Sequence, residues 1–254
     1  MINLFRKTRY DIIGKNKTGK YLMFAIGEII LVVIGILIAL QVNNLNEKRK
    51  TEVLEIQFLT RLEKDLTSDT IYFNRRIKDS ENLINLHYQF IHEAYSDQKD
   101  GREFKELVAK LDWNSENFVS QNSTYLELQS AGQLNIFKNQ ELKENIILLY
   151  KDYDIASAHI KEYNEITAHG ILKAELTYAK YWKPYSNIFD QPKMFNEIEW
   201  DFINDPVSYR FRLLEEMAAH YSGKHQVFID YFIDLKSKAK LLRNDIASEL
   251  KTRN

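Results

Sequence analysis

The 254-residue sequence has nearly balanced charge, with 35 basic and 36 acidic side chains, and it contains no cysteine. The absence of cysteine excludes disulfides, thiol catalysis and cysteine-based zinc sites. Six of the basic residues and one of the acidic residues lie within the first 20 positions, which leaves 29 and 35 in the rest of the chain, a net charge of −6. With no basic face evident there, nucleic acid is not expected as a partner.

Residues 21–42 form an apolar run of membrane-spanning length, YLMFAIGEIILVVIGILIALQV, with one carboxylate, Glu28, inside it. A helix of this length reaches roughly 33 Å, enough to cross a hydrocarbon layer about 30 Å thick. The run is longer than a typical signal-peptide core, and no A-x-A cleavage site follows it. We therefore predict an uncleaved signal anchor, a transmembrane helix over 21–42 in the lipid bilayer, with cleavage as the alternative.

The charges on the two sides of this helix predict its orientation. Residues 1–20 hold six Lys and Arg side chains, whereas the 20 residues after the helix hold four. Because the side richer in Lys and Arg stays in the cytoplasm, residues 1–20 are predicted to be a basic cytoplasmic tail. Apolar residues lie between the basic ones, so this tail either lies in the lipid headgroup layer or is a disordered segment that only sets topology.

Residues 43–254 are predicted to form an extramembrane helical domain, because only four glycines and three prolines occur there. A first helix is predicted over about 46–95, continuous with the membrane helix apart from a bend near residues 67–69, since neither Gly nor Pro lies between Gly35 and Gly101. Its apolar residues repeat every three or four positions along one face: Leu59, Leu62, Leu66, Phe73, Ile77, Ile84, Phe90 and Ile91.

Shorter helices are predicted at about 103–111 and 120–131, the second ending at Gly132 in the C′ position. The clearest periodicity starts after Asn139, a predicted N-cap. It continues in steps of four and three, which is a heptad seam, through Leu142, Ile146, Leu149, Tyr153, Ala156, Ile160, Tyr163, Thr167, Gly170 and Ala174. Because the seam residues become smaller towards Gly170, we expect a neighbouring helix to approach closely there.

A loop over 184–192 and a short helix at about 195–203 are predicted before the last helix, for which Asp205 is the expected N-cap and Pro206 the first helical residue. The last helix is predicted to end near residue 250, with a buried face of Phe211, Leu214, Met217, Tyr221, Phe228, Tyr231, Leu235, Leu242 and Ile246. The expected fold class is all-α: an N-terminal transmembrane helix followed by an elongated bundle of three long helices plus short helices, with coiled-coil spacing.

No catalytic or metal-binding motif is recognisable in the sequence. The nearest histidines are five residues apart, whereas a metal-binding face of one helix needs a spacing of three or four: His87, His92, His159, His169, His220 and His225. There is no phosphate-binding glycine loop, nucleophile elbow or HExxH motif. We expect surface or hydrogen-bonded histidines, no catalytic residue, no metal, no cofactor and a protein that is not an enzyme.

Tyrosine is abundant, with 15 residues, several of them on or beside the predicted seams. A buried hydroxyl must find a partner or reach water. These tyrosines either line a pocket between helices that receives a small-molecule ligand, or fill the core as amphipathic side chains, which is the commoner outcome. The sequence names no ligand.

The membrane helix contains four candidate contact residues: Glu28, Gly27, Gly35 and Ala39. Glu28 lies about 10 Å into the span, where a carboxylate costs of order 2.5 to 3.5 kcal/mol. It is expected to be protonated, to reach back to the inner surface, or to be paired with a second membrane protein; a tolerated residue near the inner leaflet is the alternative. Gly35 and Ala39 have the spacing of a small-residue helix contact, and Gly27 extends it.

Three segments carry a resemblance to known sequences: AIGEIILVVIGILIALQVNNLNEKRK at 25–50, STYLELQSAGQLNIFKNQEL at 123–142 and DPVSYRFRLL at 205–214. Together they resemble an uncharacterised family, a domain of unknown function, of single-pass membrane proteins from Bacteroidota. The resemblance implies a helical protein anchored in the inner, cytoplasmic membrane, and it implies no ligand, activity or catalytic residue. With the predicted orientation, the domain over 43–254 is expected in the periplasm.

Three functions follow as hypotheses. The favoured one is a non-enzymatic interaction or scaffold protein of the cell envelope, whose bundle binds a second copy of the chain or an envelope membrane-protein partner. The second is a periplasmic ligand-sensing bundle that signals through its membrane helix to a partner, because a 20-residue tail cannot hold an output domain. The third is an energy-coupling membrane subunit that uses Glu28.

Overall fold

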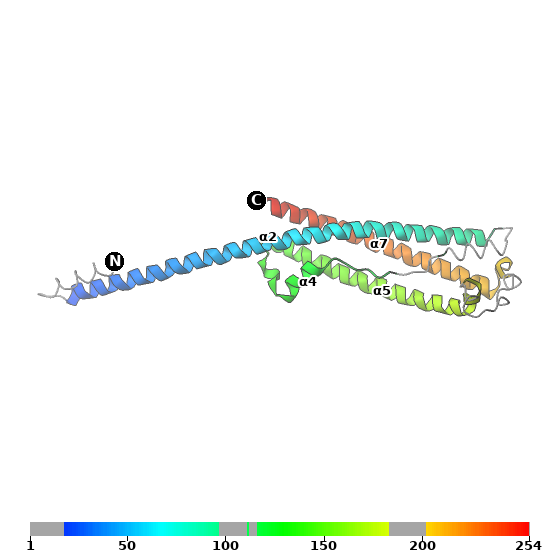
Figure 1. The fold of residues 1–254 in the computed structure, drawn as a ribbon, viewed down its shortest axis with the longest axis horizontal. Helices are drawn as coiled ribbons and strands as arrows, with labels where there is room; N and C mark the ends of the chain where they lie inside the picture. The colour runs from blue at the N-terminus through cyan, green and yellow to red at the C-terminus, as the bar shows by residue number, and fades with distance from the viewer. Residues whose placement is uncertain (1–17, 97–110, 112–115, 183–201, 254) are drawn as a thin grey trace, which may run out of the picture. The chain divides into compact units, whose positions relative to one another are not determined.

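The computed structural model describes residues 18–96, 111, 116–182 and 202–253. These residues form four α-helices and the 3-10 helix η1, and no strand occurs among them (Figure 1): α2 (Thr18–Ala94), α4 (Ser123–Ser130), η1 (Gln133–Ile136), α5 (Gln140–Trp182) and α7 (Tyr209–Lys251). A further 3-10 turn lies at 202–204. The all-α prediction is therefore confirmed. Residues 103–110 of the helix predicted at 103–111, the loop over 184–192 and most of the helix predicted at 195–203 lie outside the described residues.

The chain divides into two compact units after Ile56. In the first unit, the side chains of α2 from Tyr21 to Val42 are exposed, apart from the half-buried Ala25. Among the described helices, α2 is the one that is long and apolar enough to cross a membrane. The predicted membrane helix thus lies within α2, and the predicted domain boundary at residue 43 stays a prediction.

The second unit starts at Gln57 and contains the rest of α2 together with α4, η1, α5 and α7. In it, α5 and α7 pack side by side in opposite directions (Figure 1). Their polar contacts follow this arrangement, since Asn139 Nδ2 donates to Glu249 at 2.9 Å and Lys238 Nζ donates to Asp152 at 2.8 Å.

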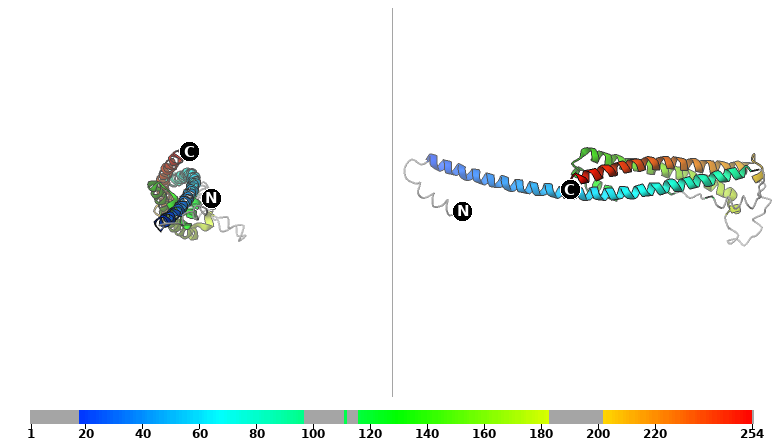
Figure 2. Two further views of the ribbon diagram at one scale, coloured as in Figure 1. Left: turned by 90° about the vertical axis from the view of Figure 1, so that its left-hand side faces the viewer. Right: turned by 90° about the horizontal axis from the view of Figure 1, so that it is seen from above.

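Helix α7 also runs antiparallel to the C-terminal half of α2, as the view from above shows (Figure 2). Lys236 Nζ donates to Asn74 Oδ1 at 3.1 Å, and the Tyr95 hydroxyl donates to Glu215 Oε1 at 2.7 Å. Each of the three long helices therefore has a neighbour against which it buries its apolar face.

Aromatic rings fill the middle of this bundle. Phe73 of α2 is fully buried, and its ring centroid lies 5.6 Å from that of Phe118, 5.7 Å from that of Tyr153 and 6.0 Å from that of Phe232. Ring pairs at these separations attract each other beyond the gain from burial alone. We call Phe73, Phe118, Tyr153 and Phe232 the aromatic layer.

The apolar faces predicted for the three long helices are confirmed for most of their residues; Ile77, Ile84, Ile91 and Tyr231 are half-buried, and the side chain of Ala174 lies outside the described ones. In α5 the side chains from Leu142 to Ile160 on the heptad seam are buried, Thr167 is buried, and Tyr163 is half-buried. The predicted N-cap is also correct, because Asn139 Oδ1 accepts a hydrogen bond from the Leu142 N–H at 3.1 Å. Helix α2 continues without a break through residues 67–69, where a bend was considered.

The close helix approach expected at Gly170 is wrong. Gly170 is exposed, and no described atom lies within 4 Å of the position that a Cβ would take. The run of smaller residues therefore does not mark a tight contact there. By contrast, Gly132 ends α4 as predicted, with φ of 64°, a left-handed conformation that glycine adopts without strain.

The predicted start of the last helix is also wrong. Helix α7 begins at Tyr209, and Ser208 is its N-cap, with Oγ accepting from the Phe211 N–H at 3.2 Å. The Asp205 carboxylate instead accepts from the Val207 N–H at 3.2 Å and closes a turn around Pro206. The capping side chain is thus three residues later than expected.

Candidate functional site

Within the second unit, the core face of α2 is interrupted by four buried polar side chains: Asp69, Arg76, Ser80 and His87. They are spaced by seven, four and seven residues, so they continue the same helical face as the buried Leu66, Phe73 and Phe90. Sequence reasoning missed them, because only apolar residues were followed along this face. The sequence did contain a sign of them: along this face, polar residues take the place of apolar ones at positions that keep the same helical spacing.

The first group of polar residues, which we call the acidic cluster, contains Asp65 and Asp69 of α2 and Tyr150 and Tyr153 of α5. Asp69 is 0% exposed, and its Oδ1 accepts a hydrogen bond from the Gln121 backbone N–H at 2.9 Å. Four oxygen atoms have no partner in hydrogen-bonding geometry within the described structure: Asp65 Oδ2, Asp69 Oδ2, Tyr150 Oη and Tyr153 Oη. The cluster therefore has unused hydrogen-bonding capacity.

Burial disfavours the ionised form of these groups. Burial raises the pKa of Asp69 to about 6, and the Gln121 N–H and the nearby Tyr153 hydroxyl only partly oppose this increase. Burial also raises the pKa of both Tyr150 and Tyr153, and the nearby Asp69 charge adds to the increase. Both tyrosines are therefore neutral donors at physiological pH, and Asp69 is the group that titrates.

The second group, the cationic cluster, contains Arg76 of α2, Asn164 of α5, and Lys224 and His225 of α7. Arg76 forms an ion pair with Glu116, and its Nη2 donates to the Glu116 carbonyl oxygen at 3.0 Å. Lys224 Nζ donates to Asn164 Oδ1 at 3.4 Å. Residues of α2, α5 and α7 thus meet around two buried basic side chains, Arg76 and Lys224.

Aromatic contacts support these cations. Lys224 Nζ lies 3.9 Å from the centroid of the Tyr221 ring, and the Arg76 guanidinium lies 5.6 Å from that of Phe232. Burial and, to a smaller extent, the Arg76 charge together lower the pKa of Lys224 to about 7. Burial likewise lowers the pKa of His225 to about 3, so this ring is neutral at physiological pH.

Two histidines meet at Tyr221, as part of the same region. The His87 ring stacks on Tyr221 with centroids 4.8 Å apart, and the His225 ring lies 4.8 Å from Tyr221 on a tilted plane. His225 Nδ1 is also 3.2 Å from Ser80 Oγ, and His87 Nδ1 is 2.7 Å from the Leu83 carbonyl oxygen. Both histidines are thus buried and hydrogen-bonded.

Of the other histidines, His159 Nδ1 contacts the Tyr231 hydroxyl at 2.6 Å and His169 Nδ1 contacts the Glu165 carbonyl oxygen at 2.7 Å. His92 and His220 are exposed. Among the described residues, no group of three or more His, Asp or Glu side chains could hold a metal ion.

Both polar clusters fix one segment, residues 116–121, on α2. Asp69 binds the Gln121 N–H, and Arg76 binds the carbonyl oxygen and carboxylate of Glu116. The two anchors are seven residues apart on α2, about 10 Å along the helix. Between them, Phe73 packs against Phe118 of the same segment. Two polar anchors and one aromatic contact thus hold this segment in a single register on α2.

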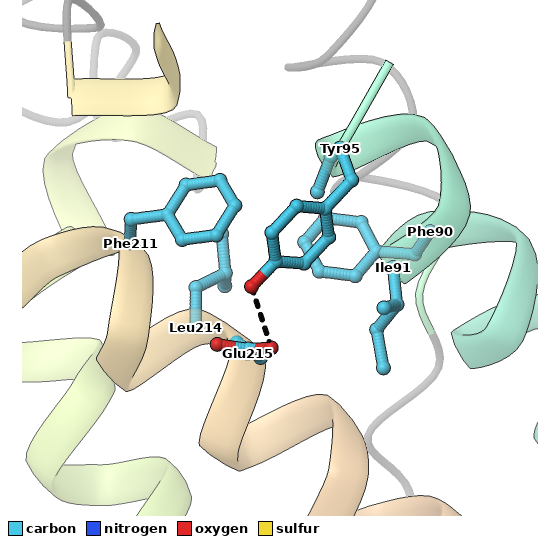
Figure 3. Close-up of a pocket in the computed structure, with 7 residues that line it drawn as sticks. Phe90, Ile91, Tyr95, Phe211, Leu214 and Glu215 are labelled. Atoms are coloured by element: carbon cyan, nitrogen blue, oxygen red, sulfur yellow. Dashed lines mark hydrogen bonds between the residues drawn. The ribbon is translucent and has the colours of Figure 1, made fainter. Parts of the chain in front are cut away.

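A small cavity lies near the C-terminal end of α2, where Tyr95 and Phe211 face each other (Figure 3). Its volume is about 10 Å³, and it is lined by Phe90, Ile91, Ala94, Tyr95, Phe211, Leu214 and Glu215. A single water needs about this much space, so the cavity is too small for a small-molecule ligand.

An open groove of about 270 Å³ lies beside this cavity, along Tyr88, Ile91, His92, Tyr95 and Ser96. These groove residues belong to α2 and its end, so this groove is not the tyrosine-lined pocket between helices considered above.

The candidate contact residues of the membrane helix lie in the first unit. Glu28, Gly27, Gly35 and Ala39 are all exposed on α2. No described atom lies within 4 Å of a Cβ built on Gly27 or Gly35. Space for a second helix is therefore open at both glycines.

Comparison with known families gives one match. The model of DUF6090, a family of unknown function, matches residues 28–171, more than half of the chain. The matched region includes Glu28, the polar residues of α2 and the tyrosines of the acidic cluster. No curated protein and no solved structure matches the chain. The chain belongs to the DUF6090 family of unknown function.

Proposed function

We propose that this protein is a membrane-anchored, non-enzymatic interaction protein of the cell envelope, with a helical bundle that binds a second copy or an envelope partner. One observation carries the proposal: the apolar side chains of α2 between Tyr21 and Val42 are exposed around the whole helix. Such a surface is costly in water and is stable in a lipid bilayer. We therefore propose a single-pass protein of the inner membrane, as the resemblance to membrane proteins from Bacteroidota implies.

The orientation follows from charge. Six Lys and Arg side chains precede the apolar segment and four follow it closely, which favours a cytoplasmic N-terminus and a periplasmic bundle. The bundle adds a second argument for an interaction role, since its centre is filled by the aromatic layer. Its outer helix faces are then the surfaces that remain for binding.

The absence of cysteine makes a direct test of topology simple, because each engineered cysteine is unique in the chain. Thr8→Cys marks the tail, and Ser237→Cys marks an exposed position of α7. In intact cells stripped of their outer membrane, an impermeant maleimide should label position 237 and leave position 8 unlabelled until the cells are permeabilised. Labelling of position 8 alone would reverse the orientation, and recovery of the chain in the soluble fraction would refute the anchor.

The interaction role is tested by photocrosslinking in native membranes. Three exposed aliphatic residues, Leu148, Ile155 and Ile166, lie on one face of α5, so a crosslinker at position 155 samples that face. A crosslinker at the exposed Lys161 samples a different face of the same helix and serves as the matched control. A specific adduct, with the full-length chain or with another membrane protein, supports the proposal. A strictly monomeric chain without adducts at either position argues against it.

A signalling bundle is the second candidate, and one observation favours it. The helix α2 runs without interruption from Thr18 to Ala94, and it carries both the apolar segment and the buried polar residues of the bundle.

The energy-coupling role of Glu28 has a separate test. Glu28→Gln should abolish that function at unchanged abundance in the membrane, and a fully active variant would exclude it.

A further inference from the structure

We propose that the acidic cluster is a proton-binding site, and that proton uptake by Asp69 tightens the packing of residues 116–125 and α5 against α2. The proposal concerns the bundle alone and does not depend on its partner or its side of the membrane. It starts from the unused hydrogen-bonding capacity of Asp65, Asp69, Tyr150 and Tyr153.

The groups that face Asp69 come from each element packed against it. Helix α2 itself contributes Asp65 one turn earlier, α5 contributes the hydroxyls of Tyr150 and Tyr153, and the segment before α4 contributes the Gln121 N–H. Helix α4 contributes Tyr125, which stacks on Tyr150 with ring centroids 4.2 Å apart. Among the described residues, neither Asp65 nor Asp69 forms an ion pair; the Arg61 guanidinium interacts with the Asp65 charge, and no cation is among the groups that shift the pKa of Asp69.

A proton is the ligand that fits this arrangement best. Tyr150 and Tyr153 are 2% and 1% exposed, and their hydroxyls belong to the same cluster as the fully buried Asp69 carboxylate. A proton on Asp69 Oδ2 removes the buried negative charge and supplies a donor beside hydroxyl oxygens that can accept it. Oδ1 remains free to accept from the Gln121 N–H. The neutral carboxyl thus keeps the existing anchor and loses the cost of burying a charge.

The pKa of Asp69, raised to about 6 by burial, places this step near physiological pH. The folded state then binds more protons than the unfolded state between about pH 4 and 6, so acidification through this range stabilises the packed cluster. This sign is the reverse of that for a carboxylate held in an ion pair, which loses its stabilising contribution in acid. The direction of the change therefore discriminates the proposed site from a carboxylate that is held in an ion pair.

The test is hydrogen–deuterium exchange of the full-length protein in nonionic detergent, corrected for the pH dependence of intrinsic exchange. For a pKa near 6, the local opening equilibrium should fall about tenfold between about pH 7 and pH 5, in peptides covering residues 116–128 and 146–156. Asp69→Asn replaces the protonated carboxyl by a neutral group of the same shape, so its opening should be low and independent of pH. Asp79→Asn, at an exposed position of α2, should behave like the wild type.

Two further measurements keep the proposal falsifiable if the exchange data are dominated by other changes. Infrared difference spectra between the two pH values should contain a protonated-carboxyl band that Asp69→Asn removes. If calcium or magnesium gives the same protection at about pH 7.5 and a chelator reverses it, the cluster is a metal site and the proposal is wrong. Equal pH dependence in the wild type and Asp69→Asn would also overturn it.

Discussion

Replacing Lys224 by Met should stabilise the protein near neutral pH, because it removes a buried charge while keeping a chain of similar length. Lys224 is 2% exposed and lies among Tyr221, Asn164 and Arg76. Burial and the Arg76 charge lower its pKa to about 7 from the ordinary value of 10.5. Between these two values the unfolded state carries a proton that the folded state does not bind.

The size of the effect follows from this difference in pKa. The wild-type free energy of unfolding should rise by up to about 1.4 kcal/mol for each pH unit between about 7 and 10, because the unfolded state binds more protons. Near pH 7.5 the buried lysine then costs at most about 4 kcal/mol. The lost contacts to Asn164 and to the Tyr221 ring offset about half of this. We expect a net gain of about 1 to 2 kcal/mol.

The assay is urea unfolding of the full-length protein in nonionic detergent, followed by circular dichroism at about pH 7.5 and pH 9.5. The difference between variant and wild type isolates the lysine, since all other titrating groups are shared. Lys240→Met, at an exposed position of α7, is the matched control and should change neither stability nor its pH dependence. A Lys224→Met protein that is less stable than the wild type near pH 7.5, or that keeps the full pH slope, would refute the reasoning.

Two other substitutions test the packing and the helix start. Phe73→Ala empties the centre of the aromatic layer and should lower the free energy of unfolding by about 3 to 5 kcal/mol, measured by urea unfolding; a loss below about 1 kcal/mol would mean that the layer collapses to fill the space. Ser208→Ala removes the N-cap of α7 and should cost about 1 kcal/mol with faster amide exchange in its first turn, whereas Asp205→Ala should leave that turn unchanged.

The fold was predictable where many weak signals agree over a long distance. The face of α5 repeats in steps of three and four from Leu142 to Thr167, and neither Gly nor Pro interrupts it before Gly170. Its N-cap, Asn139, was identified because one side chain of the right type precedes the first apolar residue. Near α7, Asp205 and Ser208 both have capping side chains, and the choice depends on a turn around Pro206 that no periodicity reports.

The polar clusters were not predictable in the same way, because each depends on contacts between residues far apart in the chain. Asp69 binds a backbone group 52 residues later, and His225 contacts Ser80 across 145 residues. A polar residue on a helix is most often solvated, so its type alone does not indicate burial. Asp69 and Arg76 do share the register of the apolar residues around them, and that register was the available sign. The sequence therefore indicates the helical face on which a buried polar residue lies, whereas only the folded structure identifies its hydrogen-bond partner.

The two clusters respond to acid in opposite directions, although they lie one heptad apart on the same helix. As the pH falls, Lys224 gains a charge that the core disfavours, and the resulting loss of stability is complete near pH 7, whereas Asp69 loses its charge below about pH 6. The first change weakens contacts of α7, and the second strengthens contacts of α5 and residues 116–121 with α2. Phe73 lies between them and packs against both α5 and α7. Acidification therefore weakens contacts on one side of the bundle and strengthens those on the other, and the two effects partly cancel in the total free energy of unfolding. The effect of Asp69 is for this reason best measured by local hydrogen exchange, and that of Lys224 by the difference between the unfolding curves of variant and wild type.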